Sequence, residues 1–115
     1  MGKNFTIETA YRNGAKSGTV TRQEILAILR AEKPYLQNRF GLLSIGLFGS
    51  YAKGAQGPES GIDLLVELTE ARYDFLAGIQ AYLEKRIVLP VELIRKRPGL
   101  GDRFLKNVEQ HIHYA

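Results

Sequence analysis

The chain has 115 residues, of which 44% are apolar and 24% are charged, and it contains no cysteine. This length suits a single domain with a core of its own, and the balance of apolar and charged residues excludes a disordered chain. The lack of cysteine excludes disulfides and thiolate metal sites, and a net charge of +4 favours polyanionic partners only modestly.

The first residues differ in character from the rest of the chain. Residues 1–19 are polar and aperiodic, so we expect a flexible N-terminal leader before a domain that spans residues 20–115. The apolar runs fall far short of the ~20 residues that a membrane span needs. We therefore expect a cytoplasmic protein that makes no use of a membrane.

The first predicted element is a helix that begins after a capping box. Thr21 and Glu24 have the spacing at which each side chain can bond the backbone amide of the other residue. Apolar residues then recur at helical spacing. We expect this helix either to end near Pro34 or to restart there and continue to Gly41, which suits a C-terminal stop.

Two strands separated by a turn follow this helix. Residues 42–48 form an apolar run between two glycines, which is typical of a buried strand. Residues 49–60 contain several glycines and a proline, and they predict a tight turn plus a loop. Residues 62–68 alternate in polarity, so Asp63 faces away from the apolar side of its strand.

The rest of the chain alternates between helix and strand. We predict a helix over residues 71–84, a strand over residues 87–94 with Pro90 at its start or on an edge, and a helix over residues 100–110. This order predicts an α/β domain with a small mixed sheet of three to four strands, flanked by helices.

Five residues suggest a site for a phosphate and a metal ion. Gly49 and Ser50 offer backbone amides and a hydroxyl to a phosphate, and Lys53 can reach the same anion. Asp63 and Glu92 lie on neighbouring predicted strands. Carboxylate oxygens shared with substrate phosphates are the ligands that Mg²⁺ prefers, so these two acids are candidate metal ligands.

The sequence motif in this segment resembles that of a known family. Residues 48–54 read Phe-Gly-Ser-Tyr-Ala-Lys-Gly, and ten residues separate Ser50 from position 61, with Asp63 two positions further on. This motif and its spacing to Asp63 resemble those of the minimal nucleotidyltransferases, small members of the polymerase-beta-like superfamily. The resemblance extends over residues 21–114.

The resemblance implies a fold, a site and a set of ligands. It implies the nucleotidyltransferase fold and a nucleoside triphosphate, expected to be ATP, used with Mg²⁺ or Mn²⁺. The implied nucleotide-binding residues are Gly49 and Ser50, beside which Lys53 stands where arginine is commoner, and the implied metal-binding and catalytic residues are Asp63 and Glu92. Family members often act as the antitoxin of a small helical partner, so such a partner is expected, whereas nucleic acid is not.

One position departs from the family pattern. An aspartate is implied at position 61, where this chain has Gly61, and Glu92 stands where aspartate is commoner. Glu59 could replace the missing acid only if its loop curled sharply. Two functions therefore stay open: transfer of a nucleoside monophosphate to a protein or small-molecule hydroxyl, and binding by a catalytically inactive relative.

The two histidines have a simpler interpretation. His111 and His113 form a His-x-His pair near the end of the sequence, with no third ligand nearby in the chain. We interpret them as part of a solvated tail.

Overall fold

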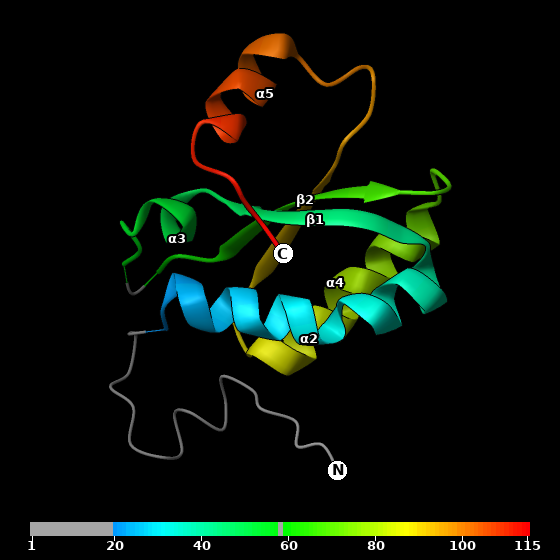
Figure 1. Ribbon diagram of the computed structural model, residues 1–115, viewed down its shortest axis with the longest axis horizontal. Helices are drawn as coiled ribbons and strands as arrows, with labels where there is room; N and C mark the ends of the chain where they lie inside the picture. Colours follow the sequence, from blue (N-terminus) through cyan, green and yellow to red (C-terminus); the bar gives the residue numbers. More distant parts are fainter. Residues whose placement is uncertain (1–19, 58) are drawn as a thin grey trace.

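A four-stranded sheet forms the centre of the molecule, and helices lie on both of its sides (Figure 1). The computed structural model describes residues 20–57 and 59–115, and the leader expected over residues 1–19 lies outside them. The elements follow one another as α2 (Arg22–Phe40), β1 (Leu42–Phe48), α3 (Ser50–Lys53), β2 (Ile62–Leu68), α4 (Tyr73–Ile87), β3 (Val91–Arg95), α5 (Asp102–Glu109) and β4 (His113–Tyr114).

The sheet is mixed, as predicted. Its strand order is β3-β2-β1-β4, with β1 antiparallel to both β2 and β4 and with β2 parallel to β3. The parallel pair is connected through α4, because parallel neighbours need a crossover between them. Helices α2 and α4 lie together on one side of the sheet, whereas α5 lies on the other (Figure 1).

Helix α2 begins and ends at the predicted signals. The Thr21 side chain accepts from the amide of Glu24, and the Glu24 side chain accepts from the amide of Thr21, which completes the capping box. The helix continues through Pro34 without a restart. Pro34 is exposed, so water can satisfy the carbonyl that loses its amide donor. Gly41 ends the helix in the left-handed conformation, with φ of 68°.

The boundary between α4 and β3 lies later than the sequence predicted. The predicted helix over 71–84 extends to Ile87, because Leu83 and Ile87 are one helical turn apart and both are fully buried. The predicted strand over 87–94 begins only at Val91. The strand starts after Pro90, which has no backbone N–H to donate to a neighbouring strand.

The C-terminal segment is part of the sheet, and our interpretation of it as a solvated tail was wrong. Residues His113 and Tyr114 form β4, which pairs with Leu47 and Gly46 of β1. Gly46 leaves room for this segment, since a Cβ there would lie only 2.5 Å from the end of the Ile112 side chain. The pairing joins residues far apart in sequence, so no local pattern announced it.

The main core lies between the sheet and the pair α2 and α4. The predicted alternation along β2 is confirmed, since Ile62, Leu64, Val66 and Leu68 all belong to this core. Asp63 and Glu67 face the α5 side of the sheet instead. Within the described ranges, no helix has both the length and the apolar character that crossing a membrane requires.

Candidate functional site

Gly49 makes the turn in which β1 passes into α3. Its φ of 79° and ψ of −153° lie in a region that is essentially restricted to glycine. A Cβ at this position would overlap the Oδ2 atom of Asp63. The backbone of Gly49 therefore lies directly against the Asp63 carboxylate, and only glycine allows this approach.

Hydrogen bonds hold in place the short helix α3 and the first residues of the loop that follows it. The amide of Ala55 donates to the Ser50 carbonyl at 2.9 Å, and Arg22 of α2 donates to the Ala52 carbonyl at 2.7 Å. The side chain of Gln56 donates to the carbonyl of Val20. These bonds hold the turn that carries Gly49 and Ser50 against the start of α2.

Asp63 and Glu92 lie side by side on the parallel strands. They are direct partners in the β2–β3 register, and Asp63 is also the partner of Phe48 in the β1–β2 register. The pKa of Asp63 is raised above its ordinary value of 3.8, first by burial, then by repulsion from Glu92 and by a hydrogen bond with it. Two carboxylates on directly paired residues of neighbouring strands form a pair that a cation would stabilise.

The third acid of the expected site is missing. Gly61 precedes β2, and its backbone φ lies outside the left-handed region, so the conformation does not require glycine. A Cβ there would lie 3.2 Å from the Pro90 carbonyl oxygen, a close contact with backbone that also accepts a hydrogen bond from the amide of Ile62. Among the residues that the structure describes, Glu59 included, no three acids or histidines come close enough to hold a metal.

The residues present therefore fit one divalent cation better than two. Mg²⁺ is commonly held by one or two carboxylates together with substrate phosphates, and Asp63 and Glu92 supply that number. A bridge between two cations would need the carboxylate that Gly61 lacks. The chemistry of the donor set, two neighbouring carboxylates, would suit a single divalent cation.

Lys53 and a cavity complete the surroundings of the turn. Lys53 is exposed at the end of α3, and a cavity of about 160 Å³ lies beside it, between α3 and α5. Asn107 and His111 line this cavity, and no sequence pattern marked either of them as a neighbour of the Gly49 turn. Asn107 lies on α5 and His111 follows the helix, and nothing local showed that this segment meets Gly49.

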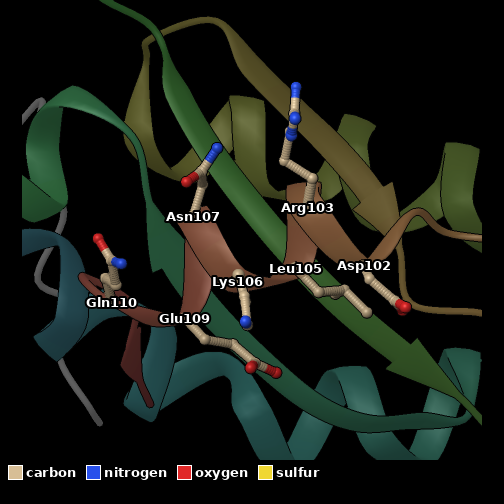
Figure 2. A pocket seen from close by; sticks show the side chains of 7 residues that line it. All are labelled: Asp102, Arg103, Leu105, Lys106, Asn107, Glu109 and Gln110. Atoms are coloured by element: carbon tan, nitrogen blue, oxygen red, sulfur yellow. The ribbon is translucent and has the colours of Figure 1, made fainter.

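A larger hollow of about 640 Å³ lies over α5 itself (Figure 2). Its lining comes from Asp102 to Gln110 and includes none of the five predicted site residues. Figure 2 shows Arg103 and Asn107 leaving α5 on one side and Lys106 and Glu109 leaving it on the other. The five predicted site residues all lie outside this hollow, so we do not place the candidate chemistry there.

Comparisons with known proteins agree with this geometry. The profile of the nucleotidyltransferase domain family matches residues 29–114. A candidate protein adenylyltransferase of Methanocaldococcus jannaschii is 41% identical over 99 residues, which are 83% of this chain and 98% of that protein. MntA, a protein adenylyltransferase of Thermococcus cleftensis, is 36% identical over 77% of this chain and 94% of its own.

Solved structures share the fold. A candidate minimal nucleotidyltransferase superposes with a TM-score of 0.60 at 26% identity, over 97% of this chain and 98% of that chain. A Shewanella oneidensis complex of a tri-AMPylated HEPN toxin with an MNT antitoxin gives a TM-score of 0.56 at 19% identity, over 82% and 71% of the two chains. That lower identity shows the fold alone.

The matched profile covers most of the chain, from within α2 to β4, and includes the turn at Gly49 and both carboxylates. The sequence relatives extend over nearly their whole length. The chain therefore belongs to the nucleotidyltransferase domain family, as one of its minimal nucleotidyltransferases.

Proposed function

We propose that this chain binds ATP with a divalent cation and transfers AMP to a hydroxyl group of a protein partner. The observation that carries the proposal is the packing of the Asp63 carboxylate against the backbone of Gly49, with Glu92 beside it. This packing brings a phosphate-binding turn and a pair of carboxylates into one site. The relatives named as protein adenylyltransferases support ATP as the donor and a protein as the acceptor.

Each site residue has a separate role in this proposal. The backbone at Gly49, the Ser50 hydroxyl and the Lys53 ammonium group bind the phosphates. Asp63 and Glu92 hold the cation, and a bound cation neutralises charge on the phosphates and orients them. Burial and the neighbouring Glu92 raise the pKa of Asp63, so a bound cation would stabilise the ionised form of Asp63.

The transfer itself is an in-line substitution at phosphorus. The hydroxyl oxygen of the acceptor bonds to the α-phosphorus, and the bond from that phosphorus to the oxygen that bridges to the β-phosphate breaks. Pyrophosphate leaves with the bonding electrons, and the proton of the hydroxyl passes to a carboxylate of the Asp63–Glu92 pair. Positioning these groups is the main task of the protein.

The proposed partner is a small helical protein that this chain neutralises as an antitoxin. The Shewanella oneidensis complex pairs an MNT antitoxin with a toxin that carries AMP groups. A tyrosine, serine or threonine hydroxyl on an equivalent partner would be the acceptor here. Identification of a modified residue on a co-purified protein would support this part of the proposal.

A second function is favoured by one specific observation. Gly61 removes the carboxylate that would bridge two cations, and no described residue replaces it. An inactive relative could keep the nucleotide pocket and act by binding its partner. In that case ATP would bind with a cation, and no AMP would be transferred.

Asp63→Asn tests the proposed function. We expect the substitution to lower Mg²⁺-dependent transfer of labelled AMP to a co-expressed partner by at least about 10²-fold, because a charge-stabilising group is lost. It should also remove the dependence of ATP affinity on Mg²⁺, measured by calorimetry. Wild-type protein that neither binds ATP nor labels any protein, with Mg²⁺ or Mn²⁺, would rule the proposal out.

Thermal unfolding of the same variant provides the control. The pKa of Asp63 is raised in the folded state, so its ionisation costs stability, and this cost grows as the pH rises through the raised pKa. Asp63→Asn removes the cost and should raise Tm at neutral pH without metal. Below the ordinary pKa of 3.8 the two proteins should differ little, which separates loss of function from unfolding.

A further inference from the structure

The cavity between α3 and α5 offers hydrogen-bond donors and no carboxylate. Its polar lining consists of Lys53, Asn107 and His111, and Gly49 forms its edge. The other lining residues are apolar: Phe48, Phe104 and Val108. In the described part of the chain, no ion pair or side-chain hydrogen bond engages Lys53, Asn107 or His111. A small cavity with this lining suits an anion.

Contacts on the α5 side of the sheet hold in position the backbone that carries Asn107 and His111, whose side chains are exposed. Phe104 meets Phe48 edge to face, with ring centroids 6.0 Å apart, and Val108 of α5 is buried. After the helix, Ile112 fills the space over Gly46. Asn107 and His111 are thus attached to the sheet through packed neighbours, and they are not carried on a free tail.

The cavity also lies next to the residues that carry the proposed chemistry. The sheet places Glu92, Asp63 and Phe48 next to one another on β3, β2 and β1. Gly49 follows Phe48 and lines the cavity. A chain of phosphates whose α-phosphate lies near Asp63 can therefore pass Gly49 and end in the cavity.

We propose that this cavity receives the two terminal phosphates of the nucleotide, with Asn107 and His111 as pyrophosphate-binding residues beside Lys53. The inference rests on the proposed function and adds residues to the same site. When the bond between the α-phosphorus and the bridging oxygen breaks, negative charge develops on that oxygen and its pyrophosphate. Donors fixed around the leaving group stabilise this charge, and they do so most strongly as the bond breaks.

The test compares three ligands that differ in their terminal phosphates. Calorimetry with Mg²⁺ would measure Kd for ATP, inorganic pyrophosphate and AMP on wild-type protein, Asn107→Ala, Asn107→Asp and His111→Gln. We expect Asn107→Ala and His111→Gln to weaken ATP and pyrophosphate about tenfold each, because each loses a hydrogen bond to a charged group. Asn107→Asp keeps the side-chain shape but adds a negative charge, so this variant should lose more affinity for ATP and pyrophosphate. AMP affinity should stay within twofold throughout.

A matched control lies on the opposite side of α5. Lys106→Ala removes a positive charge from the same helix, where the side chain points away from Asn107 (Figure 2). It should leave all three affinities unchanged, which would separate a specific pocket from general attraction. Because Asn107→Asp and His111→Gln conserve size, both variants are expected to keep the Tm of the wild type within a few degrees.

The outcomes separate this inference from the function on which it rests. If the variants weaken AMP as much as ATP, the cavity takes the nucleoside and the inference is wrong. If ATP binds but pyrophosphate affinity is unchanged in the Asn107 and His111 variants, the inference fails while the proposed function stands. If wild-type protein binds neither ATP nor pyrophosphate, both fail together.

Discussion

Gly49→Ala is expected to lower the rate of nucleotide transfer sharply and to destabilise the protein. The backbone conformation of Gly49 costs a residue with a Cβ about 1–3 kcal/mol. The new methyl group would also overlap Oδ2 of Asp63 and push the carboxylate out of position. A displacement of about 1 Å in a catalytic group can cost 10²-fold in rate, so we expect transfer to fall at least that far. Radiolabel transfer and urea unfolding would measure the two effects.

Gly54→Ala is the matched control for this substitution. Gly54 also has a positive φ, at 74°, but a Cβ there would meet nothing within 4 Å. The variant should therefore lose only the free energy of unfolding that the left-handed backbone conformation costs a residue with a Cβ, about 1–2 kcal/mol. It should retain transfer at a temperature where it stays folded. Wild-type rates in Gly49→Ala would show that the packing of Gly49 on Asp63 does not position the site.

Gly61→Asp is expected to raise the rate of AMP transfer by about 10²-fold. The added carboxylate would lie two residues before Asp63 in an extended segment and so on the same face, where it could share a second cation. Restoring one charge-stabilising group commonly has an effect of this size. The backbone φ of Gly61 does not require glycine, and a Cβ there would lie 3.2 Å from the Pro90 carbonyl oxygen, so that carbonyl must shift by a few tenths of an ångström. Transfer rates at saturating Mg²⁺, together with Mn²⁺ affinity, would measure the gain.

Gly57→Asp serves as its control, because it adds the same charge to the same loop at a position with open space around a Cβ. This variant should transfer at the wild-type rate. If wild-type protein shows no transfer and Gly61→Asp creates it, the chain is the inactive binding relative. If Gly61→Asp changes neither rate nor metal affinity, position 61 does not belong to the metal site.

Features that depend on nearby residues were predictable from the sequence. The capping box at Thr21 and the stop at Gly41 are short-range signals, and both are found where the pattern places them. The alternation of β2 placed Asp63 on the face opposite the core. The spacing from Gly49 to Asp63 pointed to the family, which the comparisons confirm.

Features that depend on distant residues were not predictable. Strand β4 exists because Gly46 leaves space for Ile112, a match between positions far apart in the chain. The same match brings His111 to the cavity beside Gly49, where local sequence suggested only a tail. The extension of α4 to Ile87 likewise follows from burial of that side chain, which tertiary packing decides.

The central claim is that one site joins the turn at Gly49 to the carboxylates of Asp63 and Glu92. A crystal structure of the protein with Mn²⁺ and a non-hydrolysable ATP analogue tests it most directly, because anomalous scattering locates the metal. We expect a manganese peak within coordination distance of both carboxylates, phosphates against Gly49 and Ser50, and the terminal phosphates beside Lys53. A peak away from Asp63 and Glu92, or an analogue bound elsewhere on the molecule, would contradict the account.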